Sequence, residues 1–272
     1  MMSYRVAAIQ MNSGHHVQKN LVTAEKLIAE AAAQGAQLIV LPEMFAVMAM
    51  DQVDKIKMGE TLDNGPIQAF LSQQALRHRV WLVGGTIPLA VPNVSEKIHA
   101  ACLVFDDQGK RVARYDKIHL FDVSLNAARE CYNESRAVTA GHEVIVVTTP
   151  FGKLGLAVCY DVRFPELFRA MHEQQVQLVA LPAAFTFTTG TVHWDILVRA
   201  RAIENQVYMI AAAQSGTHEN GRKTYGHSMI VDPWGAVKAC LPEGQGIVIT
   251  DIDFQYLQKI RDEFPVLSHR RV

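Results

Sequence analysis

Residues 37–45 read "QLIVLPEMF", and residues 177–185 read "QLVALPAAF". Each copy is a short apolar run of the kind that forms a buried strand, and each contains a Leu-Pro pair near its end. The first copy has Glu43 after the proline, where the second has Ala183. The repeat therefore indicates a shared strand architecture, with a carboxylate needed in one copy and not in the other.

Strands and helices alternate around the first copy. A strand over 4–11 and a helix over 20–33, with Asn20 as its N-cap, are predicted before it. A helix from Pro66 and a strand over 80–87 follow. This alternation is typical of an α/β fold.

The rest of the chain repeats this order after a hairpin. Residues 98–120 predict two antiparallel strands that turn at 106–109, and residues 121–141 lack periodicity and are expected to form a long, functional loop. The further predicted elements are strands over 144–150, 153–161, 177–185 and 207–214, and helices over 164–173 and 192–205. We expect two equivalent layers of sheet and helix inside a single domain over 1–272.

Composition excludes several classes of function. A formal charge of -1 and a pI near 6.8 give no electrostatic reason to bind nucleic acid or an anionic membrane. The first residues lack the apolar core and cleavage site of a signal peptide, and no apolar run reaches the roughly 18 residues of a membrane helix. A cytoplasmic location is therefore expected.

The four cysteines form no C-x-x-C pair, so neither a disulfide framework nor a zinc site is predicted. Small buried side chains are the default interpretation for Cys102, Cys131 and Cys240. Cys159 differs because it ends an apolar strand just before a predicted turn into a helix. Backbone N–H groups and the positive helix end would there favour a thiolate and receive an oxyanion.

A cysteine nucleophile needs a base, and the histidines offer no clear one. The motifs G-x-S-x-G and H-E-x-x-H are both absent. Glu43 and Lys117 instead follow apolar strands, and strand ends meet at the ligand-binding edge of an α/β sheet. The alternative interpretations are a helix-initiating carboxylate for Glu43, a solvated lysine for Lys117 and a core cysteine for Cys159.

Together the segments "LPEMF", "YDKIHLFD" and "AVCYDVRFPEL" resemble the Glu, Lys and Cys motifs of the nitrilase superfamily of carbon-nitrogen hydrolases, in the family's order and approximate spacing. The likeness covers nearly the whole chain. The segments "HWDILVRARAIENQVYMIAAAQ", "YGHSMIVDPWG" and "FPVLSHRR" are similar to one branch, the deaminated glutathione amidases related to the Nit half of Nit-Fhit proteins.

The resemblance implies a four-layer αββα sandwich without metal or organic cofactor, associating through outer helices into at least a homodimer. It also implies that Cys159 is the nucleophile, Glu43 the general base and Lys117 the cation beside the oxyanion. The family has a second glutamate in the loop after the lysine motif. Glu134 fits that position, with Glu130 as the less favoured neighbour.

The implied reaction is attack on the primary amide of a small carboxylate-bearing ω-amide, preferably deaminated glutathione, through a thioester with release of ammonia. Glu43 is expected to avoid a permanent ion pair with Lys117, since it must act as a base twice. The Tyr160 N–H would help bind the oxyanion, and Arg163 would hold the acid group unless it pairs with Glu166.

Phe185 and Thr186 would add an aromatic wall and a hydroxyl to the substrate site. The alternatives within the enzyme class are an ω-amidase acting on α-ketoglutaramate, a nitrilase and a carbamoyl-amide hydrolase. Outside that class, a non-catalytic binding scaffold could retain the fold. The intact Glu, Lys and Cys motifs argue against the scaffold.

Overall fold

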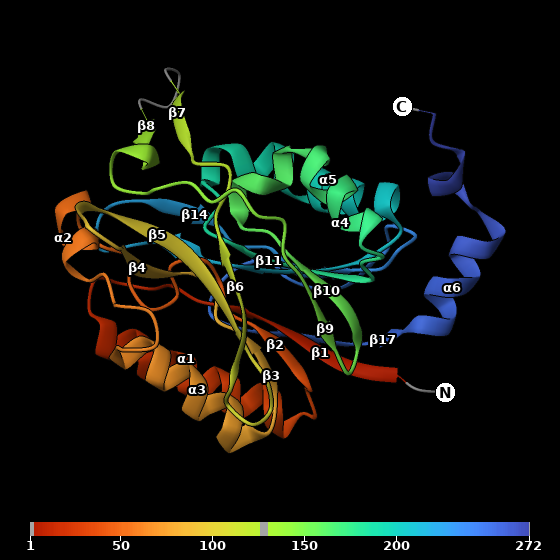
Figure 1. The fold of residues 1–272 in the computed structure, drawn as a ribbon, viewed down its shortest axis with the longest axis horizontal. Coiled ribbons are helices and arrows are strands. Elements are labelled where there is room, and N and C mark those ends of the chain that lie inside the picture. Colours follow the sequence, from red (N-terminus) through yellow and green to blue (C-terminus); the bar gives the residue numbers. More distant parts are fainter. Residues whose placement is uncertain (1–2, 126–129, 272) are drawn as a thin grey trace.

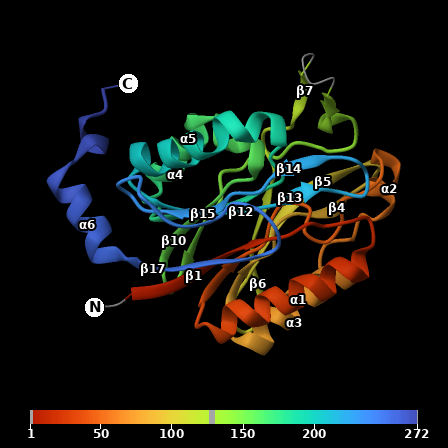
Figure 2. The same cartoon turned by 180° about the vertical axis from the view of Figure 1, so that it is seen from behind.

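The computed structural model describes residues 3–125 and 130–271. Two mixed sheets lie face to face between two layers of helices (Figures 1 and 2). The helices α1 (Val17–Ala33) and α3 (Pro66–His78) cover the first sheet, and α4 (Pro165–Glu173) and α5 (Phe187–Asn205) cover the second. The predicted α/β sandwich of four layers is confirmed.

The first sheet has the strand order β17-β1-β2-β3-β5-β4, with β6 paired to β5. Its central strands β1, β2 and β3 are parallel, whereas β17, β4, β5 and β6 pair antiparallel to their neighbours. The strands are β1 (Ser3–Gln10), β2 (Leu38–Val40), β3 (Trp81–Val83), β4 (Ile87–Val91), β5 (Val94–Phe105), β6 (Arg111–Asp116) and β17 (Gly246–Asp253).

The second sheet has the order β16-β15-β12-β11-β10-β9 and repeats the arrangement of three parallel central strands, here β10, β11 and β12. Its strands are β9 (Val146–Thr149), β10 (Gly152–Leu156), β11 (Leu178–Ala183), β12 (Tyr208–Ala213), β15 (Ser228–Val231) and β16 (Val237–Leu241). The two layers are therefore equivalent, as the repeated sequence predicts.

The two copies of the Leu-Pro string form β2 and β11, which are both central and contact each other across the sandwich. Successive side chains of a strand point to opposite faces. Leu38 and Val40 therefore pack in the core between the sheets, and Ile39 and Leu41 pack in the core beneath α1 and α3. A strand buried on both faces needs a continuous apolar run, which explains the absence of alternation in this segment.

The remaining elements lie at the ends of the sandwich. Strand β17 pairs with β1 from Ser3 to Gln10, so a strand from late in the chain forms one edge of the first sheet. The smaller elements are α2 (Gln52–Lys57), β7 (Asp122–Leu125), β8 (Glu130–Asn133), η2 (Glu134–Arg136), η3 (Cys159–Arg163), β13 (Ser215–Thr217), β14 (Lys223–Tyr225), α6 (Phe254–Glu263) and η4 (Val266–His269).

Two predicted helix and loop boundaries are wrong. Helix α1 begins at Val17 with His16 at its N-cap, and Asn20 is buried inside it, where its amide bonds the backbone of Gly14 and Ala46. The segment 121–141 is not an irregular loop, because it contains the paired strands β7 and β8 and the turn η2. Residues 126–129 of this segment lie outside the described residues.

Three strand and cysteine predictions also need correction. The predicted strand over 80–87 is divided between β3 and β4. Strand β10 ends at Leu156, so Cys159 lies in the following turn rather than at the strand end. Cys102 is buried as predicted, whereas Cys131 and Cys240 are exposed because each lies on a small or edge strand.

Candidate active site

The chain turns sharply where β2 ends, and this turn places Glu43 between the two sheets. Pro42 has no N–H to continue the ladder. Gly85 has a φ of +55°, and a side chain there would collide with the Pro42 carbonyl oxygen. Met44 has a φ of 57°, and its N–H donates to the Thr86 hydroxyl at 2.9 Å. Backbone geometry therefore fixes the direction of the Glu43 side chain.

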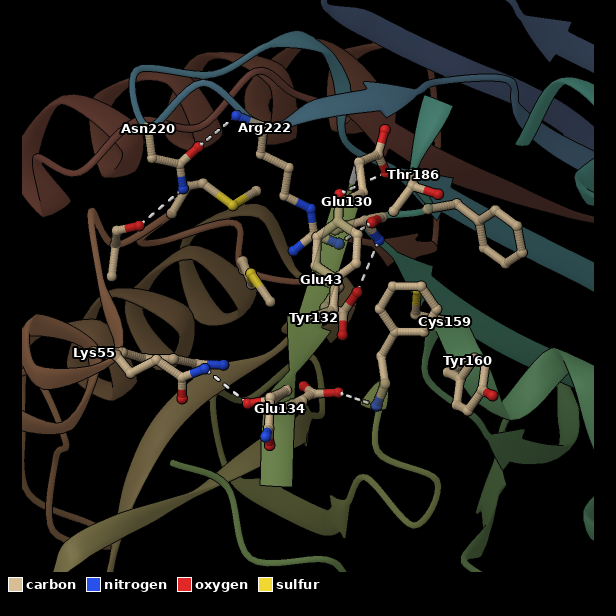
Figure 3. Close-up of a pocket in the computed structure, with 18 of the residues that line it drawn as sticks. Glu43, Lys55, Glu130, Tyr132, Glu134, Cys159, Tyr160, Thr186, Asn220 and Arg222 are labelled. Atoms are coloured by element: carbon tan, nitrogen blue, oxygen red, sulfur yellow. Dashed lines mark hydrogen bonds between the residues drawn. The ribbon is translucent and has the colours of Figure 1, made fainter. Parts of the chain in front are cut away.

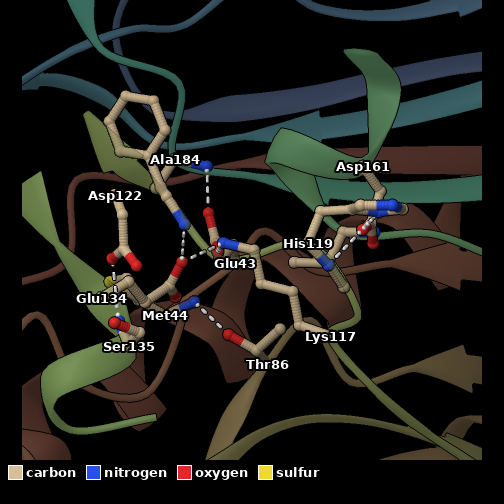
Figure 4. Close-up of polar contacts among 12 residues, drawn as sticks. Glu43, Met44, Thr86, Lys117, His119, Asp122, Glu134, Ser135, Asp161 and Ala184 are labelled. Atoms are coloured by element: carbon tan, nitrogen blue, oxygen red, sulfur yellow. Dashed lines mark hydrogen bonds and ion pairs between the residues drawn. The ribbon is translucent and has the colours of Figure 1, made fainter. Parts of the chain in front are cut away.

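Glu43 is 1% exposed and uses both carboxylate oxygens (Figure 4). Oε1 accepts from Lys117 Nζ at 2.8 Å, and Oε2 accepts from the backbone N–H of Ala184 at 2.8 Å. Ala184 belongs to the second copy of the repeated string, residues 177–185, and Glu43 belongs to the first, residues 37–45. The two copies meet at this hydrogen bond.

Lys117, which directly follows β6, lies between two carboxylates. Its ammonium group is 2.8 Å from Glu43 Oε1 and 2.8 Å from Glu134 Oε2, and the Lys117 side chain is 2% exposed. The prediction that Glu43 avoids a permanent ion pair with Lys117 is therefore wrong. Burial makes this pairing necessary, because an isolated charge in this interior would be strongly unfavourable. An ammonium has three donors, so one remains for a further acceptor.

Glu134 lies at the start of η2, beyond the hairpin of β7 and β8. Burial opposes its ionisation, but the charges of Lys117 and Lys55 and the hydrogen bonds from Lys117 Nζ and the Phe121 N–H lower its pKa. Its Oε1 is buried and has no hydrogen-bond partner in the part of the chain that the structure describes. Glu130 instead accepts from the Tyr132 and Thr188 hydroxyls, so Glu134 is the glutamate that joins the buried cluster.

Cys159 begins η3 with a φ of 49°, a conformation that side-chain-bearing residues adopt at a cost. Burial and the nearby Glu43 carboxylate raise the pKa of its thiol, and the Lys117 charge and the Ala184 N–H only partly offset this. The expectation of a favoured thiolate is therefore wrong. The helix α4 starts six residues later, at Pro165, and η3 is too short for a strong dipole. A thiol with a raised pKa can act as a nucleophile only where a base takes its proton.

A buried carboxylate, Asp161, holds the turn that carries Cys159. Oδ2 accepts from the Val158 N–H at 2.8 Å and from the Tyr115 hydroxyl at 2.6 Å. Oδ1 lies 3.0 Å from the N–H and 2.7 Å from Nδ1 of His119 (Figure 4). Arg201 Nε also donates to the Val162 carbonyl. Asp161 thereby ties η3 to the segment that carries Lys117.

Replacing Asp161 with asparagine is expected to destabilise the protein by about 2–4 kcal/mol, because an amide cannot accept hydrogen bonds at both of its terminal atoms. Turnover should fall as well, since η3 loses its tie to the lysine segment. Urea unfolding and kcat measure the two effects. Asp251→Asn is the control, as Asp251 forms an exposed pair with Arg5. Equal effects of the two substitutions would contradict the assigned role of Asp161.

These side chains open into a cavity of about 450 Å³ (Figure 3). The cavity is lined by the site residues that the sequence predicts, which are Glu43, Lys117, Glu130, Glu134, Cys159, Tyr160, Arg163, Phe185 and Thr186. Strand and turn ends from both sheets therefore bring all of them together. Thr186 also caps α5 by accepting from the Thr189 N–H, so its hydroxyl is partly occupied.

Arg163 lies over two aromatic rings of the cavity. Its guanidinium is 4.8 Å from the ring centre of Phe185 and 5.8 Å from that of Tyr160. It also lies 3.3 Å from His193 Nδ1, and it makes no ion pair with Glu166 or another carboxylate within the described ranges. Burial lowers the Arg163 pKa, with the neighbouring Cys159 and Tyr160 opposing this effect.

The opposite wall of the cavity consists of residues that the sequence did not single out. Lys55 on α2 and the adjacent Asn220 and Arg222, which precede β14, all line the cavity. Arg222 Nη2 donates to the Ala184 carbonyl at 2.6 Å, and its guanidinium lies 5.4 Å from the Tyr132 ring centre. No periodicity marks the short helix α2 in the sequence, so Lys55 had no pattern to single it out.

The described residues contain neither a candidate metal cluster nor a candidate membrane span. No group of three or more His, Cys, Asp or Glu side chains there could hold a metal ion. No helix in the same part of the chain is long and apolar enough to cross a membrane.

Residues 5–262 match the carbon-nitrogen hydrolase family, and the chain belongs to it. A Yersinia enterocolitica protein named deaminated glutathione amidase is 40% identical over 271 residues, which are 100% of this chain and 94% of that relative. The chain is therefore a cysteine-dependent amidohydrolase, as the motifs predict.

Two solved structures resemble the fold closely. The Caenorhabditis elegans NitFhit protein has a TM-score of 0.91 and 38% identity, over 99% of this chain and 65% of that longer chain. Saccharomyces cerevisiae Nit3, described as a member of branch 10 of the nitrilase superfamily, has a TM-score of 0.89 and 31% identity. The match to Nit3 covers 99% of this chain and 97% of the yeast chain.

Proposed function

We propose that this amidohydrolase cleaves deaminated glutathione, with Cys159 as its nucleophile. The observation that carries the proposal is that four residues line one cavity. Cys159 lies there on a strained turn, and Lys117 forms buried ion pairs with both Glu43 and Glu134. The names of relatives at 40% identity supply the substrate. The contacts among Glu43, Lys117 and Glu134 beside Cys159 support the roles proposed for these residues.

In the first half-reaction, Cys159 Sγ attacks the amide carbonyl carbon while a Glu43 oxygen takes the thiol proton. The raised pKa of the thiol makes this transfer to a base necessary. The tetrahedral intermediate then breaks its C–N bond, and the proton held by Glu43 passes to the departing nitrogen. A thioester on Cys159 and a free amine result.

In the second half-reaction, Glu43 takes a proton from water as the water attacks the thioester. The C–S bond breaks, the acid leaves and the Cys159 thiol is restored. The oxyanion of both steps can accept from the remaining Lys117 proton and from the Tyr160 N–H, each donor being worth about 3 kcal/mol in related sites. Glu134 Oε1, which has no partner among residues 3–125 and 130–271, can accept from the substrate N–H.

The leaving group differs from the one that the sequence motifs suggest. Glutathione is γ-glutamylcysteinylglycine, and both of its amides are secondary. Hydrolysis of the γ-glutamyl-derived amide after removal of the amino group therefore releases cysteinylglycine rather than ammonia. Ammonia would be released only from a primary amide, such as α-ketoglutaramate. The two substrates share one acyl group and differ in the amine.

Arg163 is the residue that we propose to hold the carboxylate of this acyl group. It lies four residues after the nucleophile, its guanidinium rests on Tyr160 and Phe185, and no carboxylate of the described residues neutralises it. The two rings and Thr186 then form the wall beside the acyl chain. Planar guanidinium and carboxylate groups match in a bidentate geometry.

Steady-state rates with deaminated glutathione and α-ketoglutaramate test the proposed function. We expect kcat/KM to be at least tenfold higher for deaminated glutathione, with cysteinylglycine as the released amine. Intact mass spectrometry after rapid quenching should show one acyl group on Cys159. Preference for α-ketoglutaramate, or for neither compound, would overturn the substrate assignment.

We also propose that residues 1–272 form one domain of a cytoplasmic homo-oligomer. The pairing of β17 (Gly246–Asp253) with β1 joins an early and a late segment of the chain in one sheet. The side chains of Val192, Ile196 and Ile203 on α5 are exposed and apolar, as are Trp234 and Phe264. Such an apolar face is typical of a contact between subunits. A monomer in sedimentation equilibrium would contradict the oligomer.

A further inference from the structure

The cavity wall opposite Cys159 carries two cations, Lys55 and Arg222, that form no ion pair with a carboxylate of the described residues. The Lys55 ammonium makes no hydrogen bond or ion pair with any described residue, although the residue is half-buried. Burial lowers the Lys55 pKa, more than the nearby Glu134 and Glu43 carboxylates raise it. A partly buried ammonium without a partner is unfavourable in free energy, unless a bound ligand accepts its hydrogen bonds and balances its charge.

The guanidinium of Arg222 also has a donor without a hydrogen-bond partner among the described residues. Nη2 donates to the Ala184 carbonyl, but Nε is buried and has no partner in the described part of the chain. The neighbouring Asn220 amide donates to the Ala49 carbonyl and accepts from the Arg222 N–H. These bonds fix the backbone of the turn before β14 and aim the arginine into the cavity.

Each carboxylate of the cavity forms its hydrogen bonds or ion pairs with groups other than Lys55 and Arg222. Glu43 and Glu134 bind Lys117. Asp51 caps α2 by accepting from the Asp54 N–H, and Glu130 accepts from two hydroxyls. Lys55 and Arg222 are therefore the groups left to receive an anion on this wall.

The cations of the cavity come from different elements of the fold. Arg163 belongs to η3, the element that begins at Cys159. Lys55 comes from α2 and Arg222 from the turn before β14, and Figure 3 shows these two residues together with Cys159. An amide with one acid group needs only Arg163 or only the pair of Lys55 and Arg222. A substrate with a carboxylate on each side of its scissile bond uses both.

We propose that Lys55 and Arg222 form a subsite for the terminal carboxylate of the leaving amine, so that the enzyme selects amides flanked by two carboxylates. This inference rests on the proposed function and deepens it. The amine released from deaminated glutathione ends in a glycine carboxylate, and ammonia carries none. Since the acyl group is the same in both candidate substrates, this subsite decides between them.

The test compares deaminated glutathione with its C-terminal amide, in which the glycine carboxylate is neutral. The intact enzyme is expected to prefer the free acid in kcat/KM by about 10- to 100-fold, the range for one hydrogen bond to a charged group. In Lys55→Gln this preference should shrink to about threefold or less, with the loss mainly in KM. Lys55→Arg should restore most of it.

Lys57→Gln is the matched control, because Lys57 lies on the same helix with an exposed side chain and should keep the full preference. A wild-type enzyme that cleaves both compounds equally, or a Lys55→Gln variant that keeps the wild-type ratio, would overturn the subsite. A wild-type enzyme that cleaves neither compound would instead overturn the proposed function.

Discussion

Replacing Cys159 with alanine is expected to lower amide hydrolysis by about 10⁴- to 10⁶-fold, the loss seen when a covalent nucleophile is removed. Only binding and the oxyanion donors would remain. The substitution should leave the fold intact, because the side chain loses one sulfur atom and the turn is held by Asp161 and Arg201. The rate of product formation and the Tm are both measured for the variant. A lower rate with an unchanged Tm shows that catalysis is lost and stability is not.

Cys240→Ala is the control for this experiment. Cys240 is an exposed cysteine on β16 and does not line the cavity, so its removal should leave turnover unchanged. The thioester mass should also disappear in Cys159→Ala and persist in Cys240→Ala. Residual activity within tenfold of the wild type in Cys159→Ala would contradict the nucleophile assignment.

The second large effect is expected for Lys117→Met, which removes the cation between two buried carboxylates. Breaking a buried pair from one side typically costs about 3–5 kcal/mol, and here Glu43 and Glu134 both lose their partner. Turnover should fall as well, because the oxyanion loses a charged donor. Urea unfolding at pH 8 and kcat measure the two losses.

The pH dependence of this variant follows from the Glu134 pKa. In the wild type the pKa is lowered, so the carboxylate adds stability above its unfolded pKa, and this is lost as pH falls through the folded pKa. Without Lys117 the opposing effect of burial gains weight and favours the protonated form. The Tm difference from the wild type should therefore be larger at pH 8 than at pH 5. A difference independent of pH would contradict this account.

Lys57→Met is the matched control for Lys117→Met. The Lys57 ammonium is exposed, and its ion pair with Asp54 is long, at 3.9 Å. The loss of this ion pair should therefore change stability little at either pH. A large loss in both variants would point to a general effect of removing a lysine rather than to the buried cluster.

The sequence by itself determined the layers and indicated the residues on one wall of the candidate site. Apolar runs such as 38–40 and 178–183 must be buried on both faces, and their Leu-Pro endings place Glu43 and Ala183 at matching sheet edges. Local pattern sufficed because a strand and its ending depend on neighbouring residues. The Glu, Lys and Cys motifs then indicated the family, and the family match confirms it.

The tertiary structure alone decided how those residues act on one another. Glu43 meets the Ala184 N–H across 141 positions of sequence, and Asp161 meets Tyr115 across 46. Such contacts depend on how two sheets face each other, which no local periodicity encodes. The pairing of Lys117 with two carboxylates, the raised pKa of Cys159 and the cationic wall of Lys55 and Arg222 all follow from burial of distant segments in one cavity.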